Sequence, residues 1–138
     1  MDNFSATFRR QGLILVKKKI LIIEDEPDAA ALLKLHLEKH GYEVLLAEDG
    51  KEGFRLARTR APDLILLDLV IPEIDGFWVC SMIKTDDKFA GIAVIALTAR
   101  SGDVDIKTAR ECGADDYVVK PFEFSELLVK IKGLIGES

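Results

Sequence analysis

The sequence predicts an α/β protein with an open, doubly wound, five-stranded parallel sheet and five helices. Two observations lead to this fold class. Short runs rich in Ile, Leu and Val start at residues 20, 44, 64, 93 and 117, so consecutive starts lie 20 to 29 residues apart. That interval fits one strand and one returning helix, and the intervening segments have the apolar periodicity of helices. A closed barrel would need eight such units, so the open sheet is favoured.

The expected strands are short and apolar throughout. Parallel strands that helices cover on both faces have continuous hydrophobic runs rather than alternating patterns, and the five runs have this character. They are Ile20–Ile23, Val44–Ala47, Leu64–Leu67, Ala93–Leu97 and Tyr117–Val119.

Residues at the segment ends predict the first two helices. The first begins at Pro27, a residue favoured in the first helical turn, and ends before Gly41. The second follows Asp49 and Gly50 and ends before Pro62. Both carry apolar residues at three- and four-residue spacing, so we expect each to bury one face.

The remaining three helices have similar signals. The third follows the pair Asp75–Gly76, and the fourth runs from about Asp103 to Cys112 and ends at Gly113. The last has an apolar stripe that includes Leu127 and Ile131. Five consecutive strand–helix units place helices on both faces of the sheet.

Length and composition describe one domain with its own core. The chain has 138 residues, of which 49% are hydrophobic. A chain of this size can bury a hydrophobic core that is large enough to fold without disulfides or structural metals. Its apolar runs are far too short to cross a bilayer, so we expect a soluble, cytoplasmic protein with no membrane contact. The formal net charge of −5 disfavours direct binding of nucleic acid. Cys80 and Cys112 are expected as reduced, buried thiols.

Residues 1–17 precede the first expected strand and stand outside this scheme. Three interpretations stay open: a mobile leader, an added helix or strand, and a vector-derived remnant. We therefore expect an N-terminal extension of unknown role, 1–17, followed by one domain, 18–138.

Polar residues end or follow four of the five expected strands. In chain order they are Glu24 with Asp25, Asp68, Thr98 and Lys120. In open α/β sheets the working site lies beyond the carboxyl ends of the strands. Clustered carboxylates repel each other and favour a hard divalent cation such as Mg²⁺. A hydroxyl and an ammonium around Asp68 could hold a phosphoryl group, which makes Asp68 a candidate nucleophile.

Each polar residue also has an ordinary interpretation. A single acidic residue at a strand end is usually a cap or a solvated loop residue, and we expect Glu26 and Asp28 to favour the N-terminus of the first helix. His36 and His40 have a spacing that could hold a metal, but no acidic partner accompanies them. We expect both in solvent near the helix C-terminus. The combination at four strand ends is what favours a functional site.

Four segments resemble the CheY-like receiver domains of two-component response regulators. They are ILIIEDEP at 20–27, DLILLDLVIPEIDGF at 63–77, VIALTA at 94–99 and GADDYVVKPF at 113–122. Each is a moderate signal alone, but together their order and spacing are highly specific. The resemblance covers residues 18–135 and implies the flavodoxin-like strand order 2-1-3-4-5.

The resemblance implies a magnesium site and a phosphorylation site. Asp68 matches the phospho-accepting aspartate. Asp25 resembles the direct Mg²⁺ ligand, with Glu24 beside it acting directly or through water. Asp68 and the backbone carbonyl of Val70 complete the implied ligands.

The resemblance also implies how the phosphoryl group is sensed. Thr98 matches the hydroxyl residue that moves to contact it, and Lys120 matches the lysine that pairs with it, with a cis Lys120–Pro121 bond. Tyr117 matches the aromatic residue whose rotamer is coupled to Thr98. Ala99 is small, as the family tends to require beside the phosphoryl group.

By this resemblance the protein is a phosphorylation-activated switch and not an enzyme that turns over an external substrate. A sensor histidine kinase or phosphotransfer protein donates the phosphoryl group from phosphohistidine to Asp68. The face of the fourth helix, fifth strand and fifth helix then controls a downstream protein, the chain's own output domain or a phosphorylation-dependent homodimer. Val70 and Arg100 flank the path of the hydrolytic water, so we expect slow autodephosphorylation.

Three alternatives stay open. A phosphohydrolase of the haloacid dehalogenase type wants a second Asp where this chain has Val70. A pseudo-receiver would be a phosphorylation-independent interaction module. Against it, the residues implied to bind the metal and the phosphoryl group are all present, namely Glu24, Asp25, Asp68, Thr98 and Lys120. A scaffold could dimerise constitutively through its last helices. The sequence does not name the kinase, signal or target, nor does it distinguish a stand-alone protein from the receiver of a longer regulator.

Overall fold

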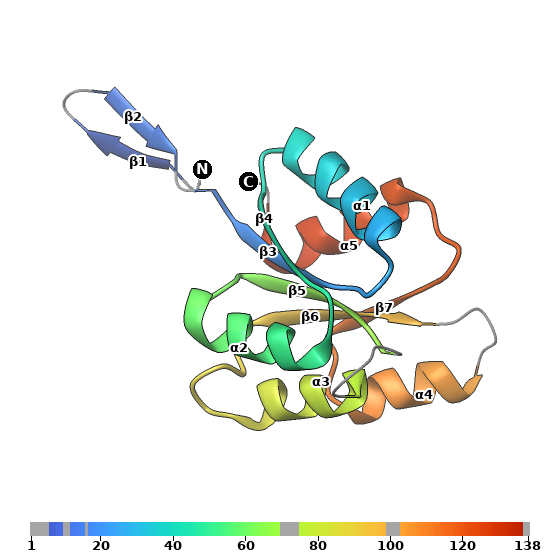
Figure 1. The fold of residues 1–138 in the computed structure, drawn as a ribbon. Coiled ribbons are helices and arrows are strands. Elements are labelled where there is room, and N and C mark those ends of the chain that lie inside the picture. Colours follow the sequence, from blue (N-terminus) through green and yellow to red (C-terminus); the bar gives the residue numbers. More distant parts are fainter. Residues whose placement is uncertain (1–5, 10–11, 16, 70–74, 99–102, 137–138) are drawn as a thin grey trace.

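The fold is a parallel sheet of five strands between two layers of helices (Figure 1). The structure is a computed structural model that describes residues 6–9, 12–15, 17–69, 75–98 and 103–136. Each strand of this sheet lies within one residue of the bounds that the sequence predicts. The strands are β3 (Lys19–Ile23), β4 (Glu43–Ala47), β5 (Leu64–Asp68), β6 (Ala93–Thr98) and β7 (Asp116–Val119).

The strand order is β4-β3-β5-β6-β7. Counted within this sheet alone, it is the expected order 2-1-3-4-5. All four neighbouring pairs are parallel. β3 and β5 therefore lie side by side where the order reverses, and the residues that follow them meet at one edge of the sheet.

Five helices cover the sheet, and their positions agree with the sequence signals. They are α1 (Pro27–Lys39), α2 (Gly50–Arg60), α3 (Gly76–Thr85), α4 (Asp103–Glu111) and α5 (Phe124–Ile135). α1 and α5 lie on one face, and α2, α3 and α4 lie on the other (Figure 1).

Side-chain caps explain where three helices begin. The Glu26 carboxylate accepts from the Asp28 N–H at 2.8 Å at the start of α1, which confirms the expected capping role. Asp49 caps α2 and Asp75 caps α3 in the same way, each at 2.8 Å. Gly41 follows α1 with a φ of 91°, a left-handed conformation that favours glycine.

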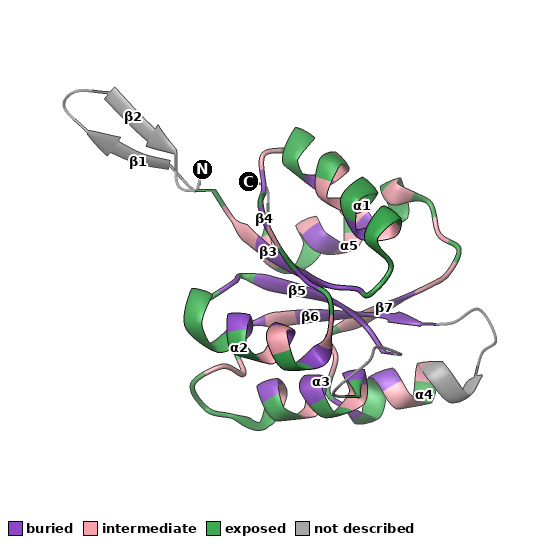
Figure 2. Ribbon diagram, in the orientation of Figure 1, coloured by how far each residue is buried: buried purple, intermediate pink, exposed green. Residues whose placement is uncertain are grey.

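Burial follows the layering (Figure 2). Every residue of the central strand β5 is buried, because helices cover both of its faces. Alternate residues of β3 enter different cores: Leu21 and Ile23 pack with α2 and α3, whereas Ile20 and Ile22 pack with α1 and α5.

A half-buried lysine stabilises the opposite edge of the sheet, where the strands begin. The Lys84 ammonium donates to the carbonyls of Ala90 and Ile92 at 2.8 and 2.9 Å and to the Asp115 carboxylate at 2.9 Å. The same Asp115 oxygen accepts from the Val94 N–H at 2.8 Å. This network joins α3, the start of β6 and the turn before β7.

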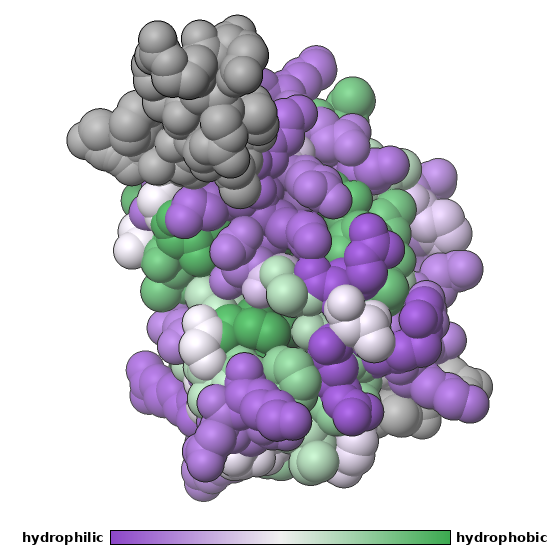
Figure 3. Space-filling view, turned by 90° about the vertical axis from the view of Figure 1, so that its left-hand side faces the viewer, coloured by the Kyte–Doolittle hydropathy of each residue, from purple (hydrophilic) through white to green (hydrophobic). Residues whose placement is uncertain are grey.

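The two cysteines are free and buried, as expected. The Cys80 thiol donates to the Cys112 carbonyl at 3.4 Å, which links α3 to the residue after α4. Among the described helices, none has the length and apolar character needed to cross a membrane. Figure 3 views the side on which the strands begin, where hydrophilic residues separate the hydrophobic patches.

An antiparallel hairpin precedes β3. It consists of β1 (Ala6–Arg9) and β2 (Gly12–Leu15), which pair with each other in a sheet of their own. Of the interpretations left open for residues 1–17, the structure therefore has added strands.

Candidate functional site

Three carboxylates converge at the edge where the strands end. Glu24 and Asp25 follow β3, and Asp68 is the last residue of the neighbouring β5. One oxygen of each lies within 4.8 Å of the others. Glu24 and Asp68 are only 4% and 8% exposed, so two of these charges lie largely out of water. The parallel pairing of β3 with β5 is what brings the two sequence segments together.

Lys120, which follows β7, reaches two of these carboxylates. Its Nζ lies 2.8 Å from Asp68 Oδ2 and 3.2 Å from Glu24 Oε1. The other Glu24 oxygen accepts from the Glu26 N–H at 3.1 Å. The strand-end residues Glu24, Asp68 and Lys120 therefore form one hydrogen-bonded group, as the sequence predicts.

The proton equilibria of this group reflect its burial. Burial raises the pKa of Glu24 above its ordinary value, and the Asp68 charge adds to this effect, against the hydrogen bonds from Glu26 and Lys120. Burial alone would lower the pKa of Lys120, but the hydrogen bonds and charges of Asp68 and Glu24 outweigh it and raise that pKa. The ammonium is thus held in its charged form by the two carboxylates.

The donor set fits a magnesium ion. Glu24, Asp25 and Asp68 offer hard carboxylate oxygens within one small region, and Lys120 pairs with two of them. Clustered carboxylates repel each other, and oxygen ligands of this kind suit Mg²⁺. Val70, whose carbonyl is the fourth ligand implied by the resemblance, lies outside the described residues.

Thr98 and Tyr117 lie on one face of neighbouring strands. The register pairs Thr98 with Val119 and Ala96 with Tyr117, so the two side chains are diagonal neighbours. Thr98 is 1% exposed, and its hydroxyl donates to the Val118 carbonyl at 3.5 Å, a long hydrogen bond. Tyr117 is half-buried. The hydroxyl is therefore turned toward β7 in this structure.

Two further expectations can be compared with the structure. The Lys120–Pro121 bond is cis, as the resemblance implies.

The expectation that both histidines lie in solvent is wrong for His36. This residue is half-buried, and the centroid of its ring lies 4.9 Å from that of Phe124. Phe124 comes from α5, so no local signal could reveal this contact. Ala99 and Arg100 lie outside the described residues.

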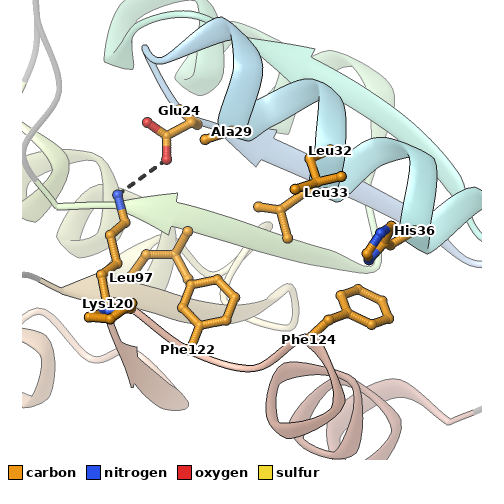
Figure 4. Close-up of a pocket in the computed structure, with 10 residues that line it drawn as sticks. Glu24, Ala29, Leu32, Leu33, His36, Leu97, Lys120, Phe122 and Phe124 are labelled. Atoms are coloured by element: carbon orange, nitrogen blue, oxygen red, sulfur yellow. Dashed lines mark hydrogen bonds and ion pairs between the residues drawn. The ribbon is translucent and has the colours of Figure 1, made fainter.

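A groove of about 910 Å³ extends from this group between α1 and α5 (Figure 4). We call it the α1–α5 groove. Glu24 and Lys120 lie at one end, and His36 and Phe124 lie at the other. Its lining residues are Glu24, Ala29, Leu32, Leu33, His36, Leu97, Lys120, Pro121, Phe122 and Phe124. The sequence gives no sign of this groove, because its walls come from distant segments of the chain.

Gly76 holds the first turn of α3 against the acidic group. A Cβ at this position would lie 2.6 Å from the Asp68 carbonyl oxygen and 2.7 Å from the Leu69 Cα. Both are backbone atoms, so they cannot move aside cheaply. The sequence marks Gly76 only as a helix start, and its contact with the end of β5 is visible only in the fold.

Comparison with known proteins points to one family. The model of the response regulator receiver domain matches residues 20–132. The DNA-binding dual master transcriptional regulator RpaA of a Synechocystis strain is 43% identical over 117 residues, which are 85% of this chain and 48% of that protein. The chain spans about half the length of the curated relatives it matches.

Solved structures agree in fold. The signal receiver domain of a histidine kinase from Syntrophus aciditrophicus superposes with a TM-score of 0.81 at 38% identity, covering 86% of this chain and 89% of that one. The receiver domain of a sensor histidine kinase from Pseudomonas aeruginosa gives a TM-score of 0.81 at 31% identity, covering 88% and 100%. That structure has a magnesium ion coordinated in its active site cleft.

Proposed function

This chain belongs to the response regulator receiver domain family, and we propose that Asp68 is the residue that accepts its phosphoryl group. The observation that carries this proposal is the 2.8 Å ion pair between Asp68 and Lys120. Glu24 follows β3 and accepts hydrogen bonds from the Glu26 N–H and from Lys120. Asp68 ends the central strand, with a cation in place for the incoming phosphoryl oxygens.

The proposed donor is the phosphohistidine of a sensor histidine kinase or of a phosphotransfer protein. A carboxylate oxygen of Asp68 attacks phosphorus, the bond from phosphorus to the imidazole nitrogen breaks, and an acyl phosphate forms. Lys120 holds a phosphoryl oxygen during this transfer. The chain is thus a switch that assists its own phosphorylation, with no external turnover.

The magnesium ligands in this proposal are Glu24, Asp25, Asp68 and the carbonyl of Val70. Mg²⁺, when bound, neutralises the negative charge that gathers around the phosphoryl oxygens. The convergence of three carboxylate oxygens within 4.8 Å of one another supports this assignment. Slow autodephosphorylation, which the resemblance implies from the residue types Val70 and Arg100, belongs to the same proposal.

We infer that Thr98 and Tyr117 transmit the signal. The hydroxyl of Thr98 has only a 3.5 Å hydrogen bond to give up when it turns toward a phosphoryl group. Because Tyr117 lies diagonally across from Thr98 on the same face, vacated space becomes available to its ring. The surface of α4, β7 and α5 then changes, and a partner that prefers the changed surface shifts the equilibrium.

The partners of this surface are also part of the proposal. They are a downstream protein, an output domain of a longer regulator, or a second copy after phosphorylation. RpaA is named as DNA-binding, but this chain matches only 48% of it. The acidic charge of this chain supports a role without direct contact to nucleic acid.

Intact-protein mass spectrometry tests the acceptor. The protein is incubated with acetyl phosphate and Mg²⁺, beside Asp68→Asn and the control Asp86→Asn, which changes an exposed loop residue. We expect one hydroxylamine-labile phosphoryl adduct in the wild type and in Asp86→Asn, none in Asp68→Asn, and none when EDTA replaces Mg²⁺. No adduct on the wild type, together with no binding of beryllofluoride, would favour the phosphorylation-independent module.

A further inference from the structure

A cluster of aromatic, apolar and basic side chains lies on α2 and α3, which cover the same face of the sheet (Figure 1). The centroids of the Phe54 and Trp78 rings are 5.2 Å apart, and the Arg58 guanidinium lies 5.2 Å from the Phe54 centroid. Met82 follows Trp78 by one turn of α3 and shares its side of the helix. We call Phe54, Arg58, Trp78 and Met82 the α2–α3 patch. The proposed phosphoryl transfer uses none of them.

The apolar part of the patch faces water. Trp78, the single tryptophan of the chain, and Met82 are each 40% exposed, and Phe54 is half-buried. The inner side of α3 is already occupied, because Val79 and Ile83 are buried in the core. A contiguous group of exposed apolar side chains is typical of an interaction site. Trp, Met and Arg are also the residue types that protein interfaces favour.

The charge of α2 is opposite in sign to that of the whole chain. The formal net charge of the chain is −5, whereas α2 has one acidic residue, Glu52, and four basic residues, Lys51, Arg55, Arg58 and Arg60. Arg55 is paired with Glu52 at 2.7 Å. Within the described part of the chain, Arg58 has no ion pair with a carboxylate and contacts an aromatic ring instead. Its charge therefore stays available to a partner.

We propose that the α2–α3 patch is a docking surface for a short acidic segment of a partner protein. An apolar side chain of this segment packs on Trp78 and Met82, and its carboxylates pair with Arg58. Charge complementarity selects this occupant, since a short segment meets the basic helix alone. A nucleic acid fits less well, because a long polyanion would extend over the acidic remainder of the chain. The surface is separate from α4, β7 and α5.

A designed peptide tests the proposal. The probe is a short, fluorescently labelled peptide in which Asp and Glu surround Phe and Leu, and it contains no Trp. Anisotropy of the label measures the affinity, and the emission of Trp78, the single tryptophan, shows whether the patch is the surface that binds. We expect saturable binding that weakens as salt is added, because exposed charges are screened. Peptides with Lys and Arg for the acidic residues, or with Ser for Phe and Leu, should not bind.

Substitutions locate the contact. Arg58→Glu reverses the charge of the patch and should weaken peptide binding about tenfold or more. Met82→Ser removes exposed apolar surface and should weaken it roughly threefold or more. The matched controls are Lys39→Glu and Leu35→Ser, which make the same kinds of change at exposed residues of α1, on the other face of the sheet. Both should bind within about twofold of the wild type.

Four outcomes would overturn the inference. The first is no binding of the acidic peptide, and the second is equal weakening in Arg58→Glu and Lys39→Glu. Tighter binding of a single-stranded oligonucleotide, lost in Arg58→Glu, would assign the patch to nucleic acid. Self-association of the wild type that Arg58→Glu abolishes would assign it to a second copy. The titration needs no phosphodonor, so its failure leaves the proposed function of Asp68 unaffected.

Discussion

The ammonium of Lys120 lies 2.8 Å from the carboxylate of Asp68, although the strands that end beside them, β7 and β5, are not neighbours in the sheet. β6 lies between them, and the long lysine side chain passes over its end. The same ammonium reaches Glu24 after β3 at 3.2 Å. One cation thus joins the ends of three strands and partly neutralises the carboxylates there.

Replacing Lys120 should separate metal binding from phosphoryl transfer. In Lys120→Met the carboxylates lose their cation, so Mg²⁺ meets less repulsion and should bind roughly three- to tenfold more tightly. Transfer from acetyl phosphate should slow, because no ammonium holds the phosphoryl oxygens. Calorimetric titration of Mg²⁺ and mass spectrometry measure the two effects. Lys88→Met, at an exposed loop residue, should change neither, and weaker Mg²⁺ binding in Lys120→Met would contradict this account.

Glu24→Gln should stabilise the fold in magnesium-free buffer near pH 7. The raised pKa of Glu24, which exceeds its ordinary value of 4.5, means that the folded state binds the proton more tightly than the unfolded state does. The free energy of unfolding therefore falls as pH rises from about 4.5 toward the raised pKa. Above the raised pKa the whole of this loss is present. If Glu24→Gln adds about 1 kcal/mol to the free energy of unfolding, the unfolding temperature should rise by roughly 4 °C.

Thermal unfolding at several pH values measures this effect. The difference between Glu24→Gln and wild type should shrink as pH falls through 4.5, where the wild-type carboxyl is protonated in both states. Millimolar Mg²⁺ should raise the unfolding temperature of the wild type more than that of the variant. A pH-independent difference would point to packing instead of charge.

Two glycine substitutions should have opposite effects on stability. Gly76→Ala places a Cβ against the backbone of Asp68 and Leu69, and we expect a loss of about 2 kcal/mol or more in the free energy of unfolding, with weaker Mg²⁺ binding. Gly133→Ala lies inside α5, where a Cβ would meet nothing within 4 Å. It should add about 0.5–1 kcal/mol. Urea denaturation of both variants checks the pair, and equal effects would refute the steric explanation.

Lys84 should matter far more than an exposed lysine. Its side chain is 14% exposed in its pair with Asp115, and Lys84→Met would leave two part-buried carbonyls and the Asp115 carboxylate without this donor, at a cost of about 2–3 kcal/mol. The matched control is Lys34→Met, which removes an exposed pair with Glu38 at 3.9 Å and should cost at most about 0.5 kcal/mol. Chemical denaturation distinguishes these values.

The sequence predicts the elements well because their signals are local. Apolar runs and caps such as Glu26 and Asp49 act within a few residues, so strand positions and helix starts agree with the structure. The positions of Glu24, Asp68 and Lys120 at strand ends follow from the same signals. Their functional grouping also depends on the strand order, which the residues alone leave open and the family resemblance supplies.

Only the tertiary structure decides contacts between segments that are distant in the chain. The 2.8 Å approach of Lys120 to Asp68, the ring contact of His36 with Phe124, and the contact of Gly76 with the end of β5 all require the packed sheet and helices. The α1–α5 groove is of the same kind. Local patterns determine which elements form, whereas side-chain packing between elements determines which surfaces meet and which stay open.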